Sequence, residues 1–211
     1  MVTFQRVFQP EVLYPMPDHE LKGNWSAAVF KNNFPIVLEL GCGRGEYSIH
    51  LAKTFPQKNF VGVDIKGARL WRGAKTANDE HILTAAFLRM RIEFIEAFFG
   101  RQEVSEIWIT FPDPQLKDDR EHRRLTHPEF IARYKRMFKP HGILHLKTDS
   151  AELYEYTLES LAAEKGTFLV STNDLYGSGI ADEILSVKTV YELQALKAAK
   201  KITYIKFQFA E

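Results

Sequence analysis

Residues 36–46 read IVLELGCGRGE, a mainly apolar run that leads into a turn holding Gly41, Gly43 and Gly45. The apolar run is typical of a buried strand, and residues 45–54 after it have the apolar spacing of a helix. Glycine permits positive φ and lets the backbone approach a ligand closely. The stretch therefore predicts a strand, a tight turn and a helix, with the turn at the carboxyl end of the strand, where α/β sheets bind ligands.

The alternation of strand and helix continues to the end of the chain. Segments joined by crossovers of helix length form parallel sheets covered on both faces. The expected fold class is therefore α/β: a doubly wound, mainly parallel, seven-stranded sheet in a single domain. Residues 34–211 form this domain, and residues 1–33, rich in proline, are expected to be an N-terminal arm with a short helix near 25–30. Strands are predicted at 36–40, 59–64, 84–90, 104–110, 142–148, 167–171 and 202–209. Helices are predicted at 45–54, 66–78, 92–99, 150–164 and 188–200, and a further helix is predicted to begin at the capping box 126–129.

Composition bounds the class of protein. The 211 residues include 28 Lys and Arg against 27 Asp and Glu, and 45% are hydrophobic, which excludes a disordered chain, a collagen-like fibre and a strongly basic coat protein. A single cysteine, Cys42, fits a reducing compartment. The sequence shows no signal-peptide h-region and no apolar run of membrane-spanning length, so a soluble cytoplasmic protein is expected. The seven histidines show no metal-ligand spacing, and we expect no metal.

Asp64 ends the second predicted strand, about 20 residues after the glycine turn, where an acid accepts hydrogen bonds from ribose hydroxyls. Glu46 stands where a dinucleotide-binding turn has its last glycine, and its carboxylate opposes a pyrophosphate, which argues against NAD or FAD. A cofactor with a zwitterionic amino-acid headgroup suits the turn better. The alternative is a turn whose Asp64 merely caps the next helix. Glu39, inside a buried strand, is expected to contact the loop amides or the ligand, because an unpaired buried carboxylate is costly.

Several motifs together resemble known methyltransferases. Glu39-Leu-Gly-Cys-Gly-Arg-Gly45 with Asp64 resembles motifs I and II of the class I S-adenosylmethionine-dependent methyltransferases, which have a Rossmann-like fold. Phe111-Pro-Asp-Pro114, REHRRL at 120–125, Lys147-Thr-Asp149 and Thr189-Val-Tyr-Glu192 resemble the tRNA (guanine-N7)-methyltransferase family, across about residues 22–209. The resemblance implies S-adenosylmethionine as cofactor, tRNA as partner and methylation of guanine N7, at the variable-loop guanine. No membrane partner is implied, and the chain is expected to be a monomer or a homodimer.

The resemblance also implies roles for individual residues. Asp113 is expected to be catalytic and to contact the cofactor. The sequence departs from the family pattern in three ways. Gln115 replaces a tryptophan, and Asp118 and Asp119 follow Lys117 where a basic residue is usual. An acid or amide is missing at 91–92, where Glu93 is a possible substitute. Further expected cofactor contacts are Glu39, Gly41, Gly43, Asp64, Arg91 and Ile92; expected substrate contacts are Lys117, Asp149, Thr189, Val190, Tyr191 and Glu192; expected RNA contacts are Arg120, Arg123 and Arg124.

The chemistry is consistent with these residue types. Guanine N7 has an in-plane lone pair and no proton, so methyl transfer needs alignment and negative potential rather than a general base. Asp113, held between two prolines, supplies a carboxylate with little backbone freedom. Asp149 also fits an N-cap of the following helix. Residues 115–139 hold eight basic and four acidic residues, which concentrates positive charge beside the site.

Other readings stay open at this point. The basic residues Lys66, Arg69, Arg72 and Lys75 would lie on one helix face, which is as consistent with a solvated surface as with an RNA contact. A methyltransferase acting on an exocyclic amine normally has a second proline and then an aromatic residue after Asp113-Pro114, and this chain has Gln115 and Leu116 at those two positions. A non-catalytic RNA-binding module of the same fold is a further alternative, which binding of S-adenosylmethionine would separate from an enzyme. An NAD-linked oxidoreductase is opposed by Glu46.

Overall fold

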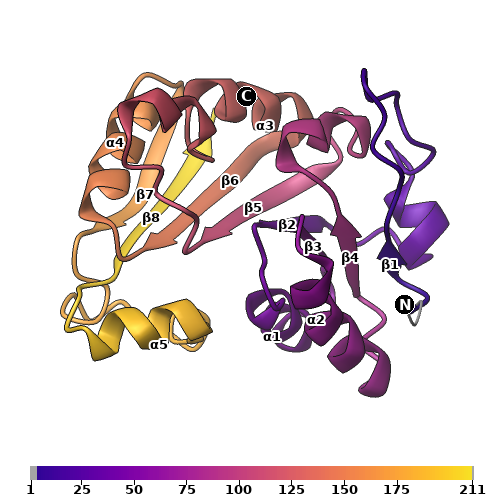
Figure 1. The fold of residues 1–211 in the computed structure, drawn as a ribbon, viewed down its shortest axis with the longest axis horizontal. Helices are drawn as coiled ribbons and strands as arrows, with labels where there is room; N and C mark the ends of the chain where they lie inside the picture. The colour runs from indigo at the N-terminus through magenta and orange to yellow at the C-terminus, as the bar shows by residue number, and fades with distance from the viewer. Residues whose placement is uncertain (1–3, 211) are drawn as a thin grey trace.

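The computed structural model describes residues 4–210; residues 1–3 of the predicted arm and residue 211 lie outside them (Figure 1). Within this range one sheet of eight strands has the order β1-β4-β3-β2-β5-β6-β8-β7. The strands from β1 to β6 pair in parallel, and β8 runs antiparallel between β6 and β7. The mainly parallel α/β prediction is confirmed. The strands are β1 (Val7–Phe8), β2 (Ile36–Leu40), β3 (Asn59–Asp64), β4 (Ala85–Arg89), β5 (Val104–Thr110), β6 (Phe138–Thr148), β7 (Gly166–Thr172) and β8 (Thr203–Phe209).

The predicted strand count of seven is one too low. The additional strand is the two-residue β1 in the arm, which pairs with β4 through Val7 opposite Phe87. The arm's expected helix is present as a short π-helix, η1 (Ser26–Phe30). Trp25, just before it, is fully buried: its indole stacks on Phe99 at 5.0 Å and donates a hydrogen bond to the Phe98 carbonyl. The arm therefore packs into the same core as the rest of the chain.

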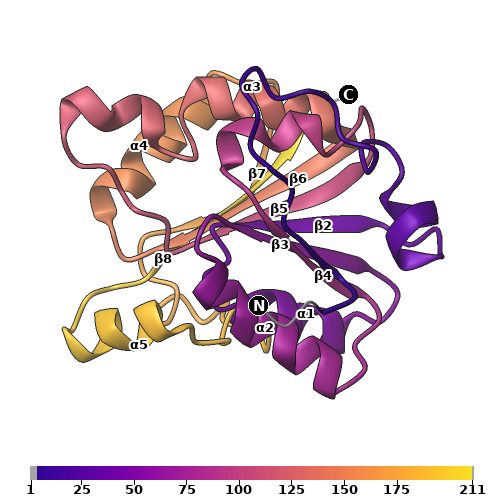
Figure 2. The same cartoon turned by 45° about the vertical axis from the view of Figure 1, so that its right-hand side comes forward.

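Helices cover the two faces of the sheet in different groups (Figure 2). On one face, α3 and α4 pack with the arm over a core that includes Tyr134 and Phe207. On the other face, α1, α2 and α5 surround a second core around Tyr47 and Trp108. The helices are α1 (Glu46–Thr54), α2 (Gly67–Asp79), α3 (Pro128–Met137), α4 (Ala151–Ala162) and α5 (Val190–Lys197), with 3-10 turns η2 (Ile92–Ala97) and η3 (Asp118–Arg123).

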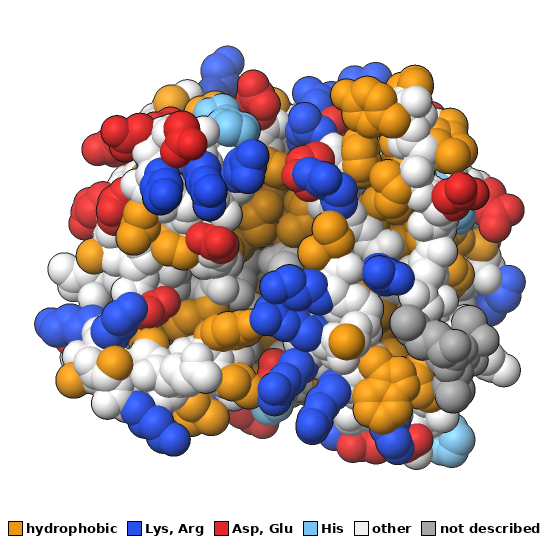
Figure 3. All heavy atoms as spheres, viewed as in Figure 1, with side chains coloured by type: hydrophobic (Ala, Val, Ile, Leu, Met, Phe, Trp, Pro, Cys, Tyr) orange, Lys and Arg blue, Asp and Glu red, His pale blue; other side chains and the backbone are white. Residues whose placement is uncertain are grey.

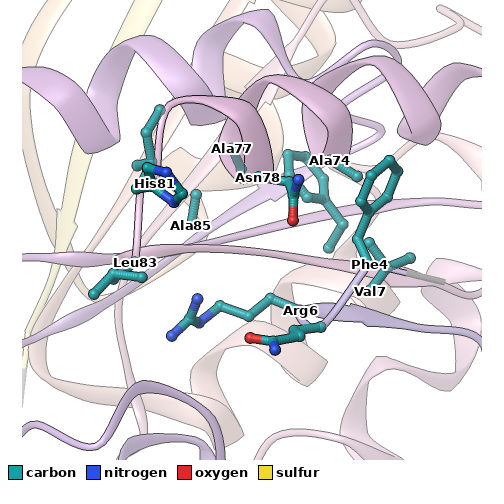
Figure 4. Close-up of a pocket in the computed structure, with 12 residues that line it drawn as sticks. Phe4, Arg6, Val7, Ala74, Ala77, Asn78, His81, Leu83 and Ala85 are labelled. Atoms are coloured by element: carbon teal, nitrogen blue, oxygen red, sulfur yellow. The ribbon is translucent and has the colours of Figure 1, made fainter.

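A small cavity of about 90 Å³ lies where the arm meets α2 (Figure 4). Phe4 and Val7 of the arm and Ala74 and Asn78 of α2 line it. Residues 4–7 of the arm thus lie against α2 and β4. No helix within residues 4–210 has the length and apolarity needed to cross a membrane.

Two predicted helix caps are shifted by one residue. The cap of α3 is His127, whose Nδ1 accepts from the Glu129 amide, and not Thr126. Thr126 is fully buried and accepts a hydrogen bond from the Thr157 hydroxyl at 2.8 Å, because α4 packs over it. Similarly, the cap of α4 is Ser150, which leaves the Asp149 carboxylate available for other contacts.

Candidate active site

A cavity of about 910 Å³ opens at the carboxyl ends of strands β2 to β6. Figure 3 shows a hollow in the middle of this face, with Lys and Arg side chains gathered beside it. Parallel strands bring their carboxyl ends to one edge of the sheet, which is why residues far apart in the sequence meet here. Of the residues expected from the sequence, those that line the cavity are Gly41, Gly43, Asp64, Arg91, Ile92, Asp113, Arg123, Asp149 and Tyr191.

The glycine turn is held against the end of β3 by hydrogen bonds. The amides of Gly41 and Cys42 donate to the Val63 carbonyl at 2.8 and 3.0 Å. The Gly43 amide donates to one oxygen of Asp64 at 2.9 Å, and the other oxygen accepts from the Lys66 amide at 2.7 Å. Each carboxylate oxygen has a second acceptor position, so Asp64 can still bind ribose hydroxyls.

Gly45 shows why the turn needs glycine. Its φ is +70°, and a Cβ there would lie 2.6 Å from the Phe87 ring. Any side chain would therefore force apart the turn and β4. At Gly43, by contrast, a Cβ would meet no atom within 4 Å, so the missing side chain leaves open space beside the backbone on the cavity side.

Glu39 lies behind the glycine turn. Its carboxylate accepts from the Ser48 amide at 2.8 Å, the Ser48 hydroxyl at 2.6 Å and the Thr110 hydroxyl at 2.9 Å. Burial raises the pKa of Glu39 to about 7, although the hydrogen bonds from Ser48 and Thr110 oppose the shift. These partners, rather than the loop amides, satisfy the carboxylate in the structure. Its contact with the cofactor stays a prediction.

Asp113 stands exposed at the end of β5, in the turn 111–115. The residues at both ends of the turn, Phe111 and Gln115, have left-handed φ values of 48° and 47°. One carboxylate oxygen of Asp113 accepts from the Gln115 amide at 3.1 Å. The other oxygen can meet a ligand in the cavity, beside the glycine turn, because β5 pairs directly with β2.

Further charged residues at the cavity form ion pairs. The Asp149 carboxylate lies 2.6 Å from Lys200, and both residues line the cavity. Arg91 and Glu93 pair at 2.9 Å where the family has an acid or amide. Burial acts to raise the pKa of Glu93, but the hydrogen bond from Arg91, a backbone hydrogen bond and the charges of Arg91 and Arg133 together outweigh burial and lower that pKa. An acid is therefore present at this edge of the cavity, one or two residues later than the family pattern places it.

Within residues 189–192, one side chain lines the cavity and others are buried in the interior. Thr189 is buried and caps α5 by accepting from the Glu192 amide. The Glu192 side chain is fully buried and pairs with Lys147 behind the cavity. Burial raises the pKa of Glu46, and the backbone of Val190 opposes this shift. Tyr191 lines the cavity, with its ring 5.6 Å from the guanidinium carbon of Arg69.

The basic residues around η3 also differ in their exposure to solvent. Lys117, Arg120 and Arg123 are exposed, and Arg123 lines the cavity. Arg124 is only 6% exposed, and its guanidinium donates to the Pro114 carbonyl at 3.2 Å and to Glu152 at 3.0 Å. On the other side of the cavity, α2 and the residue before it contribute Arg69 and Lys66.

Sequence reasoning missed one wall of the cavity. It consists of mainly apolar residues on one side of α5 and around the start of α3, with one glutamine on α5. A spacing of three and four residues from Tyr191 is the signal that could have found the α5 members, since such residues share a helix face. These additional lining residues are Leu125, Phe130, Gln194, Ala195 and Ala198. Within residues 4–210 there is also no group of three or more His, Cys, Asp or Glu side chains arranged to hold a metal.

Comparison with known proteins identifies the family. Residues 33–205 match a family model described as "Putative methyltransferase". A tRNA (guanine-N(7)-)-methyltransferase of Christiangramia forsetii is 51% identical over 97% of this chain and 92% of its own length. This chain belongs to the tRNA (guanine-N7)-methyltransferase family. A second tRNA (guanine-N(7)-)-methyltransferase, from Bacteroides thetaiotaomicron, is 47% identical over 100% of this chain and 83% of that protein.

Solved structures of other methyltransferases share the fold. The 16S rRNA methyltransferase KamB superposes with a TM-score of 0.69 at 13% identity, covering 98% of this chain and 99% of that one. The 16S rRNA (adenine(1408)-N(1))-methyltransferase of Catenulisporales acidiphilia gives a TM-score of 0.62 at 15% identity, covering 95% and 99%. The predicted class I methyltransferase fold is confirmed, and the tRNA (guanine-N7)-methyltransferase family shares it with rRNA-modifying enzymes.

Proposed function

We propose that this protein transfers a methyl group from S-adenosylmethionine to N7 of a guanine in tRNA and so forms N7-methylguanosine. One observation carries the proposal: Asp64 with the glycine turn and Asp113 with its proline turn line a single cavity. The glycine turn with Asp64 suits a nucleoside cofactor, and the proline turn places the Asp113 carboxylate in the same cavity. The substrate class follows from the relatives, which are tRNA (guanine-N(7)-)-methyltransferases.

The residues at the glycine turn fit S-adenosylmethionine. The space beside Gly43 accepts a ligand close to the backbone, and Asp64 has acceptor positions left for a ribose. The cavity of about 910 Å³ lies within the range of about 300–1,000 Å³ typical of small-molecule sites. When bound, this cofactor supplies a methyl group on an electrophilic sulfonium. Gly41, Gly43 and Asp64 would hold it, with Arg91 and Ile92 beside the adenine.

Asp113 would orient the guanine. Its carboxylate accepts hydrogen bonds from the N–H groups of the Watson–Crick edge and so turns N7 toward the methyl donor. As N7 is alkylated the base becomes cationic, and the nearby negative charge stabilises that cation. Because N7 carries no proton, the chain does not need a general base to create the nucleophile.

The rim of the cavity would receive the rest of the RNA. Asp149 and Tyr191 would contact the guanine nucleotide, with Lys117, Thr189, Val190 and Glu192 as further substrate residues implied by the family. Arg120 and Arg123 would neutralise phosphates. The family points to a guanine in the variable loop of tRNA, and we place the reaction in the cytoplasm. The working form is a monomer or a homodimer.

Incubation with unmodified tRNA and labelled S-adenosylmethionine tests the proposal. The label should enter tRNA, and borohydride–aniline treatment, which cuts at N7-methylguanosine, should cut the product at one guanine. The fragment lengths then show whether this guanine lies in the variable loop. Labelled tRNA that resists cleavage would favour methylation of an exocyclic amine, and failure to bind S-adenosylmethionine would favour a non-catalytic RNA-binding module.

A further inference from the structure

We infer that Arg124 is a positioning residue that holds the turn carrying Asp113, while its neighbour Arg123 contacts RNA. The inference rests on the proposed function, because it assigns a role within the same site. It also revises the sequence-based expectation that both arginines bind RNA phosphates. The two residues are adjacent in the sequence, yet their side chains lie in different environments.

The first observation is where the Arg124 guanidinium lies. Its Nε donates to the Pro114 carbonyl at 3.2 Å, and one terminal nitrogen donates to the Glu152 carboxylate at 3.0 Å. The guanidinium carbon also lies 4.4 Å from the centre of the Tyr156 ring. An arginine that is stacked, paired and 6% exposed is engaged by the protein itself. A phosphate could reach it only by displacing these partners.

Arg123 provides the contrast. It is exposed, lines the cavity and makes no ion pair with another residue in the described range 4–210. Free guanidinium groups at the rim of a site are the side chains that meet phosphates. The structure therefore assigns the RNA contact to Arg123.

The second observation is the conformation of the turn. Phe111 and Gln115 both have left-handed φ values although neither is glycine. Such a backbone is strained and persists where the surrounding structure fixes it. At its start, the turn is tied to β6 by the Phe111 amide, which donates to the Lys147 carbonyl at 2.8 Å. At its far end, Arg124 holds the Pro114 carbonyl, one residue after Asp113.

The third observation is the position of Glu152, the ion-pair partner of Arg124. Glu152 is in the first turn of α4, which begins two residues after Asp149. The same guanidinium thus connects the turn of Asp113 to the helix that follows Asp149. It fixes the relative placement of two acids that line the cavity from neighbouring strands. A small displacement of either acid would misalign the guanine, since reactive alignment tolerates little error.

Replacing each arginine by lysine separates the two roles, because lysine keeps the charge and loses the planar fork. We expect Arg124→Lys to lower kcat at least tenfold, with KM for tRNA, its salt dependence and the affinity for S-adenosylmethionine within twofold of wild type. Arg123→Ala should raise KM for tRNA with a smaller change in kcat, and Arg123→Lys, which keeps the charge, should raise KM by less. A wild-type kcat in Arg124→Lys, or a raised KM with a flatter salt dependence, would overturn the inference.

A second variant covers the case in which Arg124→Lys does not fold. The Glu152 side chain is 56% exposed, so Glu152→Gln removes the ion pair with the Arg124 guanidinium without changing a buried side chain. Hydrogen exchange at the amides of residues 115–117 should become faster in this variant and stay unchanged in Arg123→Ala. Unchanged exchange in Glu152→Gln would contradict the positioning role. A wild-type protein that does not methylate tRNA would refute the proposed function alone, because the exchange experiment needs no turnover.

Discussion

The Lys147 ammonium lies 2.8 Å from the Glu192 carboxylate, and neither side chain has any exposure to solvent. Lys147 also donates to the carbonyls of Leu185 and Val187, at 2.6 and 3.2 Å. The Tyr176 hydroxyl donates to the second oxygen of Glu192 at 2.6 Å. Burial lowers the pKa of Lys147, and the Glu192 charge partly offsets this. Strand β6 therefore anchors α5 and the loop before it.

Breaking this ion pair should be costly. We expect Lys147→Met to destabilise the protein by about 3–5 kcal/mol, because it leaves Glu192 buried without a counter-charge. The double variant Lys147→Met with Glu192→Leu should lose much less than the sum of the single changes. Urea denaturation measures both, and Lys200→Met, which breaks the exposed pair with Asp149, is the control with an expected cost of about 1 kcal/mol or less. Additive losses in the double variant would contradict coupling.

Asp113→Asn should remove most turnover while the protein stays folded. The amide keeps the shape of the side chain but loses the negative charge that stabilises the methylated base, so kcat should fall about a hundredfold. Part of the affinity for S-adenosylmethionine, measured by calorimetry, should remain. Asp119→Asn, an exposed acid in η3, is the matched control and should keep full activity. Near-normal turnover of Asp113→Asn would remove Asp113 from the proposed mechanism.

Arg123→Ala should weaken tRNA binding and lower its salt dependence. Loss of one phosphate contact reduces the slope of log K against log salt concentration by about 1. Filter binding across a salt series measures this slope. Arg101→Ala removes an exposed charge at the amino-terminal side of β5, away from the cavity, and should leave the slope unchanged. Equal slopes in wild type and Arg123→Ala would show that this residue does not meet a phosphate.

Glu39 should make stability depend on pH. Its pKa rises from 4.5 to about 7 on folding, so the folded state binds the proton more tightly. Its contribution to stability is therefore full below pH 4.5 and is lost as the pH rises to 7. We expect Glu39→Gln to remove this loss, which amounts to about 3 kcal/mol. The check is urea denaturation at pH 5 and pH 8: the stability of Glu39→Gln relative to wild type should improve at the higher pH, and a constant difference would contradict the shift.

The central strands were predictable because each is a buried apolar run between turn residues. The predicted and observed bounds of β2, β3 and β5 agree to the residue. Strand β6 begins four residues before its prediction, because Pro140 and Gly142 interrupt the apolar pattern that indicates a strand. In the structure, residues 139–142 bulge between Phe138, opposite Val104, and Ile143. The two-residue β1 has no pattern of its own and forms because β4 offers it an edge.

The site was predictable to the extent that topology determines it. Gly41, Asp64 and Asp113 each follow or end a parallel strand, and the sheet brings such positions to one edge. The difference between Arg123 and Arg124 could not be predicted, because adjacent arginines look alike in a sequence. Their environments depend on α4, which supplies partners to one and not to the other.

The pairing of β1 with β4 has a consequence for the behaviour of the protein in concentrated solution. Without β1, the backbone groups of β4 near Phe87, whose amide now donates to the Arg6 carbonyl at 2.8 Å, would face solvent unpaired. An open strand of this apolar composition is a template for pairing with another molecule. By pairing with β4, the short arm segment therefore opposes intermolecular sheet extension and aggregation at this edge.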